Sequence, residues 1–349
     1  MLQLLLGGSG SGKTTLLYQR IRTRAEKGEK SILLVPEQFT SSTEGRIYRE
    51  LGDALSGMVE SFSFTSLAEK ILSTEGGAAV QTLSDAGRAV LVRRALEELQ
   101  DNVHYYHRHR RSAAFCQMAA QTIDELKSAG LSGRQLAQLA GACGAESGKL
   151  SELALIFQGY ETLLARSGMD PSDRLELAGA RLEEALARHS LPEFLRDRAV
   201  FIDEFDTFNA PKKRLLGAML AALPSVTVAL CDDGAPLLPG DLSLFSGAKQ
   251  VAAQLRQLAR KNGAEVAVPQ LLRKDLRHRN APGLAAVAEL LETGSCTADA
   301  PAGEVRLFAA PSREEEARAA AGAIRRLMRQ GVRCGKIAVV CRDIAKYRA

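Results

Sequence analysis

The stretch LLLGGSGSGKTTLL, residues 4–17, contains the strongest motif of this chain. It fits the pattern G-x-x-x-x-G-K-[ST], with Gly7 and Gly12 at the glycine positions, followed by Lys13 and Thr14. Glycines let the backbone curl so that successive amide N–H groups face phosphate oxygens, and the positive end of a following helix adds to the attraction. The lysine of such a loop reaches the β- and γ-phosphates, and the hydroxyl ligates Mg²⁺. The residues expected to hold the nucleotide phosphates are Gly7, Gly8, Ser9, Gly10, Ser11, Gly12, Lys13, Thr14 and Thr15.

The flanking sequence supports this P-loop. Apolar residues 2–6 predict a strand that enters the loop, residues 13–27 predict a helix that leaves it, and residues 31–35 predict a second strand that ends at Pro36. The sequence contains no N-K-x-D motif, which reads guanine in GTPases. A nucleotide-binding P-loop that is not that of a GTPase is therefore expected.

A second candidate motif lies about 190 residues further on. Residues 199–202 predict a buried strand that ends in Asp203 and Glu204. P-loop ATPases hold Mg²⁺ through an aspartate at this position, called the Walker B aspartate. An adjacent glutamate can act as the base towards the attacking water. Alone, the pair could equally be an acidic loop after an ordinary strand; together with the P-loop it predicts ATP and Mg²⁺ as ligands.

The order of predicted elements gives the fold class. A helix over residues 212–223 and a third strand over residues 225–233 continue a β-α-β rhythm, which is typical of a parallel sheet. Residues 85–194 carry apolar residues at helical spacing and almost no strand pattern. We therefore expect an α/β fold, in which an all-helical subdomain is inserted into a RecA-like P-loop domain.

The last part of the chain predicts a second lobe. A basic cluster at residues 271–280 precedes a helix that runs through Leu291. Residues 304–311 and 336–341 then read as strands on either side of a helix capped by Ser312. The expected domains are the first part of the P-loop ATPase domain at residues 1–84, the helical insertion at 85–195, the rest of the P-loop domain at 196–270 and the beginning of a truncated second α/β lobe at 271–349.

Composition and charge place limits on function. The chain has 349 residues, of which 46% are apolar and 25% charged, and a net charge of +5. Any surface for nucleic acid must therefore be local; the basic and aromatic residues 104–111 (HYYHRHRR) are one candidate, and a solvated linker is the alternative. No apolar run reaches the roughly 18 residues of a membrane span. The six cysteines form no C-x-x-C pair, which is typical of a reduced, cytoplasmic protein.

The order of these motifs resembles that of superfamily 1 helicases. Over nearly its whole length, the sequence resembles the N-terminal part of AddB-type subunits of AddAB helicase–nucleases. The stretches that carry the narrower resemblance are GGSGSGKTT (7–15), VPEQFT (35–40), SFSFTSLAEKIL (61–72), TIDELKSAGLSGRQL (122–136), KLSELALIFQGYETLL (149–164) and FIDEFDTFNAPKK (201–213). The resemblance implies ATP-dependent processing of DNA double-strand breaks for recombinational repair. It implies an AddA-type partner, binding of single-stranded and end-bearing duplex DNA, recognition of a Chi sequence, and an iron–sulfur cluster only in a C-terminal region absent from this sequence.

By position, the resemblance also implies residue roles. Gln38, Thr40, Phe64 and Phe208 are expected to contact single-stranded DNA, with core packing as the alternative for the two phenyl rings. Arg277 takes the place of the second-lobe arginine that touches the γ-phosphate. Glu204 favours ATP hydrolysis.

The segment ALCDDG, residues 229–234, lacks the glutamine of the coupling motif found in active motors. This absence favours the alternative of a nucleotide-modulated single-strand-binding module without its own motor activity. An unrelated P-loop phosphotransferase is a third interpretation, opposed by the distance between the P-loop and Asp203 and by the VPEQFT match.

Overall fold

The computed structural model describes residues 1–79, 81–144, 147–295 and 304–347. The chain divides into two compact units, Met1–Arg277 and His278–Ala349, and each is described by itself. None of the helices in the described ranges is long and apolar enough to cross a membrane.

The first unit is built on a six-stranded sheet in which every neighbouring pair is parallel. The strand order is β3-β2-β4-β5-β1-β6. The strands are β1 (Leu2–Gly7), β2 (Ser31–Leu34), β3 (Val59–Phe62), β4 (Ala199–Ile202), β5 (Ser225–Cys231) and β6 (Gln270–Leu272). The expected α/β fold with a parallel sheet is confirmed, and β1, β2 and β4 lie within one residue of their predicted bounds. Strands β3 and β6 were not predicted, because each is short and mixes polar with apolar residues.

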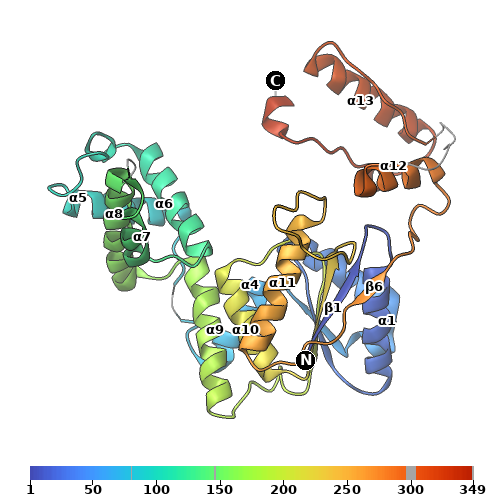
Figure 1. The fold of residues 1–349 in the computed structure, drawn as a ribbon, viewed down its shortest axis with the longest axis horizontal. Helices are drawn as coiled ribbons and strands as arrows, with labels where there is room; N and C mark the ends of the chain where they lie inside the picture. Colours follow the sequence, from blue (N-terminus) through green and yellow to red (C-terminus); the bar gives the residue numbers. More distant parts are fainter. Residues whose placement is uncertain (80, 145–146, 296–303, 348–349) are drawn as a thin grey trace. The chain divides into compact units, whose positions relative to one another are not determined.

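Helices cover both faces of this sheet (Figure 1). Leu2, Leu4 and Leu6 of β1 point to one face, and Leu5 points to the other. The first face packs against α4 (Phe64–Glu75), α9 (Pro171–Ala187), α10 (Ala210–Ala222) and α11 (Ser246–Lys261). The second packs against α1 (Lys13–Glu26), α2 (Thr40–Leu51) and α3 (Asp53–Ser56). Because both faces are buried, the central strand β4 is entirely apolar and its neighbours β2 and β5 are mostly so.

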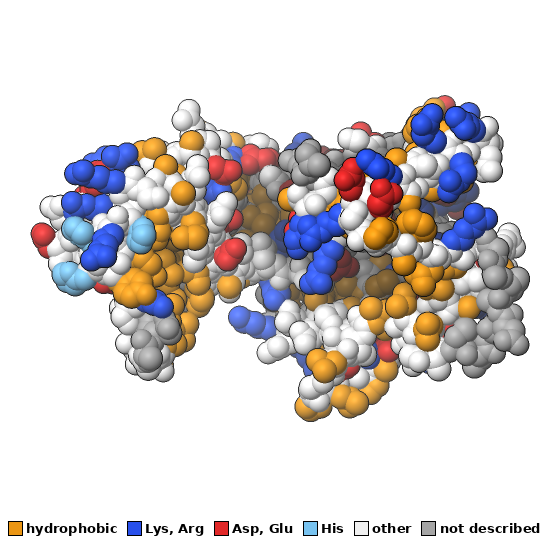
Figure 2. Space-filling model, turned by 90° about the horizontal axis from the view of Figure 1, so that it is seen from above, with side chains coloured by type: hydrophobic (Ala, Val, Ile, Leu, Met, Phe, Trp, Pro, Cys, Tyr) orange, Lys and Arg blue, Asp and Glu red, His pale blue; other side chains and the backbone are white. Residues whose placement is uncertain are grey.

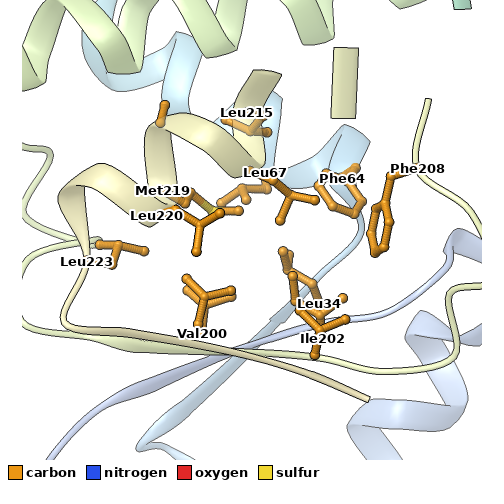
Figure 3. Close-up of a cluster of buried hydrophobic side chains, with 14 of the residues drawn as sticks. Leu34, Phe64, Leu67, Val200, Ile202, Phe208, Leu215, Met219, Leu220 and Leu223 are labelled. Carbon is orange, nitrogen blue, oxygen red and sulfur yellow. The ribbon is translucent and has the colours of Figure 1, made fainter. Parts of the chain in front are cut away.

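The core between the sheet and α10 is shown in Figure 3. Leu34, Val200 and Ile202 rise from the strands towards the side chains of α10 above them. Phe64 and Phe208 close one end of this cluster. The same cluster therefore fixes the carboxyl ends of β2 and β4, which precede the candidate DNA contacts and Asp203.

The inserted segment is helical, as expected, and has its own core. Helices α5 (Asp85–Glu98), α6 (Ala113–Ser128), α7 (Gly133–Ala140) and α8 (Ser147–Ser167) bury a separate cluster of apolar side chains that includes Val92, Ile123 and Phe157. Helix α9 lies inside the predicted insertion at 85–195 but belongs to the sheet layer, because Leu175, Ala178 and Leu182 are part of the sheet's core. The separate core of the insertion is therefore formed by α5 to α8 and does not include α9.

A buried polar cluster joins the insertion to α9. Lys127 Nζ of α6 lies 2.7 Å from carboxylate oxygens of Asp170 and Asp173. Tyr160 of α8 donates its hydroxyl proton to Asp170 Oδ1 over 2.6 Å. Burial raises the pKa of the Tyr160 hydroxyl, and the hydrogen bond to Asp170 raises it further. Buried polar groups are costly unless they are paired, so this cluster specifies how α6, α8 and α9 meet.

The second unit contains α12 (Pro282–Thr293) and α13 (Arg313–Arg329), with short 3₁₀ turns at Cys334–Lys336 and Ile344–Tyr347. The predicted cap is confirmed: Ser312 Oγ accepts a hydrogen bond from the Glu315 amide over 3.3 Å. The strands predicted at 304–311 and 336–341 are wrong, since the backbone there is irregular or forms a 3₁₀ turn. A strand needs a hydrogen-bonded neighbour, and the described residues of this unit contain no strand.

The boundary between the units also differs from the expected one. Residues from 271 onward were expected in the second lobe, yet β6 pairs with β1 through Leu271↔Leu6 and Leu272↔Gly7. The compact first unit continues to Arg277. The basic segment 273–277 therefore belongs to the P-loop unit.

Candidate nucleotide-binding site

The loop after β1 has the backbone shape that its glycines predict. Gly10 and Gly12 have φ angles of 79° and 91°, in the left-handed region that side chains disfavour. A Cβ on Gly10 would lie 2.7 Å from the Cβ of Arg277, and one on Gly7 would lie 2.4 Å from Ser11 Oγ. Helix α1 starts directly afterwards at Lys13. The loop thus leads into a helix N-terminus with no room for larger residues.

The polar groups of this loop fit a polyphosphate. The Lys13 ammonium donates to the carbonyl oxygens of Gly7 and Gly8, each over 2.8 Å, and lies 3.6 Å from Cys231 Sγ. The Ser11 hydroxyl is buried and makes no hydrogen bond within the described residues. The amides of the first turn of α1 have no acceptor inside the helix. Donors and a cation are therefore gathered at the carboxyl end of β1.

The structure brings Thr14 and Asp203 together. Asp203 follows β4, and its amide donates to the Leu34 carbonyl over 3.1 Å, which fixes it at the carboxyl edge of the sheet. Burial raises the pKa of the Asp203 carboxyl, while the Thr14 hydroxyl, the Glu204 amide and the charge of Lys13 oppose that rise. Thr14 and Asp203 line the same cavity, and a hydroxyl with a carboxylate fits Mg²⁺, which keeps several waters and takes phosphate oxygens as its other ligands.

No group of three or more His, Cys, Asp or Glu in the described ranges is placed to hold a metal.

Glu204 has an unusual backbone. Its φ is 64°, in the left-handed region, and its amide donates to Asp203 Oδ1 over 3.0 Å. Its side chain is exposed. Partial desolvation and the charge of Asp203 raise the pKa of the Glu204 carboxyl, whereas Arg46 lowers it. A carboxyl with a raised pKa suits a general base.

Arg277 lies beside the P-loop. Its Nη1 donates to Ser9 Oγ over 3.1 Å, and the Leu276 amide donates to the Gly10 carbonyl over 2.9 Å. The segment that carries Arg277 therefore lies against the phosphate-binding loop, within the same unit. Its contact with the γ-phosphate stays a prediction.

A cavity of about 240 Å³ lies beside Thr14, Asp203 and Glu204. Tyr18 and Arg46 also line it, and the Arg46 guanidinium carbon lies 4.9 Å from the centre of the Tyr18 ring. Burial raises the pKa of Tyr18 to about 12. Sequence reasoning missed both residues. Tyr18 could have been found one helical turn after Thr14, but nothing in the motif at 35–40 marks Arg46.

The four candidate DNA contacts fall into two groups. Gln38 is exposed and Thr40 is half-buried; the Thr40 hydroxyl donates to the Glu37 carbonyl over 2.9 Å. Phe64 and Phe208 are only 2% and 4% exposed, and their ring centres lie 6.0 Å apart. These two rings offer no face to a base in this structure, which corresponds to their core-packing alternative. Phe39, which sequence reasoning passed over, is 37% exposed between Gln38 and Thr40.

The basic segment at residues 104–111 lies at the tip of the insertion, and Figure 2 shows His, Lys and Arg side chains gathered at the left of the view. The Glu152 carboxylate accepts hydrogen bonds from the amides of His104, Tyr105 and Tyr106, which hold the segment on α8. The Tyr105 ring is 56% exposed, with the Lys149 ammonium 5.3 Å from its centre. The segment is therefore held in place and accessible, far in sequence from the P-loop.

These features define a class of protein. A parallel sheet covered by helices on both faces, with a glycine-rich loop after β1 and with Thr14 and Asp203 lining one cavity, is consistent with a RecA-like domain. A family model described as "ADDB, N-terminal" matches residues 4–288. The chain belongs to this family.

The similar proteins include three that are named as B subunits of an ATP-dependent helicase/deoxyribonuclease. The protein from Desulforudis audaxviator is 34% identical over 360 residues, that from Symbiobacterium thermophilum 33% over 371 and that from Moorella thermoacetica 32% over 363. Each alignment covers 99% of this chain. The chain spans only 30–31% of the length of these curated relatives.

Proposed function

We propose that this chain is the ATP-binding, helicase-like part of a helicase–nuclease B subunit that processes DNA double-strand breaks for recombinational repair. One observation carries the proposal: Thr14 and Asp203, distant in sequence, line the same cavity. The segment Gln38–Thr40 follows β2, the strand that pairs directly with β4. A nucleotide site and an accessible polar segment therefore follow adjacent strands.

Each residue of the nucleotide site has a proposed task. The P-loop amides and Lys13 bind the phosphates, and Thr14 and Asp203 hold Mg²⁺. Glu204 orients or deprotonates the attacking water. Arg277 contributes charge from the segment that lies on the loop.

The proposed DNA contacts are revised by the burial of the phenyl rings. Gln38 and Thr40 supply an amide and a hydroxyl for base edges, as the family resemblance implies. Phe39, rather than Phe64 or Phe208, offers an exposed ring on which a base can stack. Phe64 and Phe208 belong to the core cluster that includes Leu34 of β2, the strand that precedes this segment.

The wider assembly is proposed on the family alone. We infer an AddA-type partner, DNA with an end as substrate, a Chi sequence as the recognised signal and the cytoplasm as the compartment. An iron–sulfur cluster is proposed only for a C-terminal region of the longer protein.

A second candidate, a nucleotide-modulated strand-binding module without motor activity, is favoured by the end of β5. This strand lies between β1 and β4 and ends at Cys231, followed by Asp232. The Asp232 carboxylate is buried and accepts a hydrogen bond from the Gly234 amide over 2.7 Å. It therefore stabilises the turn that follows β5. The strand therefore presents no side-chain amide to couple nucleotide and DNA.

The test is binding of fluorescent single-stranded and duplex DNA, measured by anisotropy with and without Mg-ATP at two salt concentrations. We expect tighter binding of single-stranded than of duplex DNA, with an affinity that changes when nucleotide is added. The double variant Gln38→Ala/Phe39→Ala should bind single-stranded DNA more weakly than the wild type. Lys13→Ala should keep DNA binding but remove the nucleotide effect. No DNA binding at low salt, with ATP binding intact, would contradict the proposal. Turnover of ATP that depends on single strands and is lost in Glu204→Gln would favour the first candidate over the second.

A further inference from the structure

The cavity beside Asp203 contains a cation that the P-loop motifs do not explain. Arg46 lies on α2, and its guanidinium is held over the Tyr18 ring, 4.9 Å from the ring centre. Cation–π contact of this kind fixes the position of a guanidinium while leaving its N–H groups available. Within the part of the chain that the structure describes, Arg46 makes no hydrogen bond or ion pair. Its donors are therefore positioned but not engaged by protein groups.

The other cations around the site already have partners. Lys13 donates to the carbonyl oxygens of Gly7 and Gly8, and Arg277 donates to Ser9 Oγ. Arg49, one turn after Arg46 on the same cavity, donates through Nε to the Gly45 carbonyl of its own helix. Arg46 thus differs from its neighbour Arg49 in having its donors directed at no protein acceptor.

Arg46 lines the cavity in which we expect the terminal phosphate of a nucleotide. The cavity that it lines is also lined by Thr14, Asp203 and Glu204. In a P-loop site the hydroxyl and the carboxylate meet Mg²⁺ next to the β- and γ-phosphates, and the glutamate faces the water beyond the γ-phosphate. A side chain that lines this cavity is therefore expected next to the γ-phosphate rather than the α-phosphate.

The charges point the same way. Asp203 and Glu204 place two carboxyl groups on this cavity, and Arg46 lines it with them. A third phosphate adds negative charge that a diphosphate lacks. Guanidinium groups suit phosphate oxygens because their N–H groups form a planar fork.

We propose that Arg46, on α2, is a specificity-determining residue whose guanidinium binds the terminal phosphate of a nucleoside triphosphate, so that the site distinguishes triphosphate from diphosphate. This inference rests on the proposed nucleotide site. It goes beyond that site because it assigns a sensor outside the P-loop, on the helix that begins at Thr40.

The test compares the affinities of the whole chain for Mg-ADP and for the non-hydrolysable triphosphate Mg-AMP-PNP by titration calorimetry. The wild type should bind the triphosphate more tightly. Arg46→Ala should reduce this preference by about ten- to hundredfold, the effect of a charge-assisted hydrogen bond, and leave ADP affinity nearly unchanged. Arg46→Lys should restore part of the preference. Arg49→Ala, the matched control, should leave it intact.

A second measurement needs no variant. Phenylglyoxal modifies accessible arginines, and peptide mass spectrometry reports which ones. Mg-AMP-PNP should protect Arg46 more than Mg-ADP does, and Arg49 should be modified equally with both. Equal modification of Arg46 with both nucleotides, or equal loss of ADP and AMP-PNP affinity in Arg46→Ala, would overturn the sensor while leaving the nucleotide site in place. Absence of any nucleotide binding by the wild type would instead contradict the proposed function itself.

Discussion

The two units of the chain bury their apolar residues very differently. In Met1–Arg277 three apolar clusters pack on the two faces of the sheet and inside the insertion. In the described residues of the second unit only Gly283 is buried, and Leu307 and Val340 are 101% and 91% exposed. Yet both units form capped helices. The backbone hydrogen bonds of a helix close within one segment, whereas those of a strand need a partner strand.

The largest expected effect comes from one phenylalanine in each unit. Phe64 is buried with its ring against those of Phe205 and Phe208, so Phe64→Ala should lower the free energy of unfolding of the first unit by about 3–5 kcal/mol. Phe308 of the second unit is 66% exposed, and Phe308→Ala should change the free energy of unfolding of the chain by less than about 0.5 kcal/mol. Urea titration followed by circular dichroism measures both. Similar costs for the two variants would contradict the difference in burial between the two units, and a small cost for Phe64→Ala would make that ring a candidate DNA contact again.

The next effect uses two tyrosines that each donate to a carboxylate. Tyr160 donates to buried Asp170 over 2.6 Å, and Tyr347 donates to exposed Glu316 over 2.8 Å. Tyr160→Phe should cost about 1.5–3 kcal/mol, the value for a hydrogen bond to a charged group that is left buried. Tyr347→Phe should cost almost nothing, because water replaces the hydroxyl. Thermal unfolding of both variants measures the difference, and a cost for Tyr347→Phe equal to that for Tyr160→Phe would argue against the exposure of the second unit.

A smaller effect, of opposite sign, is expected at Glu204. A non-glycine residue in the left-handed region costs about 1–2 kcal/mol, and glycine in its place loses about 0.5–1 kcal/mol to entropy. Glu204→Gly should therefore stabilise the first unit by about 0.5–1 kcal/mol while removing the proposed base. Unfolding in urea measures the gain. Destabilisation would mean that the Glu204 side chain contributes more to the fold than its exposure indicates.

The smallest difference between the units is expected at helix caps. Ser63 Oγ accepts the Ser66 amide over 3.1 Å, and Ser312 Oγ accepts the Glu315 amide over 3.3 Å. Replacing either serine by alanine should cost about 0.5–2 kcal/mol of local stability, because a cap acts within one turn. Hydrogen exchange at the Ser66 and Glu315 amides should accelerate by similar factors. A much larger change at Ser66 would show that capping also depends on the core.

The same distinction explains what the sequence could predict. The P-loop and strands β1, β2 and β4 were predictable because continuous apolar runs lead into glycine-rich or acidic segments. The strands expected at 304–311 and 336–341 carried a similar apolar pattern, but no described strand of their unit pairs with them. Apolar pattern alone does not show whether a pairing partner is present.

Side-chain roles were harder to predict than elements. Phe64 and Phe208 could be read as base-stacking or core residues, and only their burial distinguishes the two. No sequence motif predicted a role for Arg46, because it is brought near Asp203 only by the pairing of β2 with β4. Arg277 was placed beside the phosphate loop by resemblance, and the structure puts it next to Ser9 within the first unit.

The most direct test of the central claim is calorimetric titration of the chain with ATP in the presence and absence of Mg²⁺, for the wild type and for Lys13→Ala. If the loop after β1, Thr14 and Asp203 form a nucleotide site, the wild type binds one ATP per chain in a Mg²⁺-dependent manner and the Lys13→Ala variant, folded by circular dichroism, does not. Retained micromolar affinity in Lys13→Ala, or no binding by the wild type, would contradict the account.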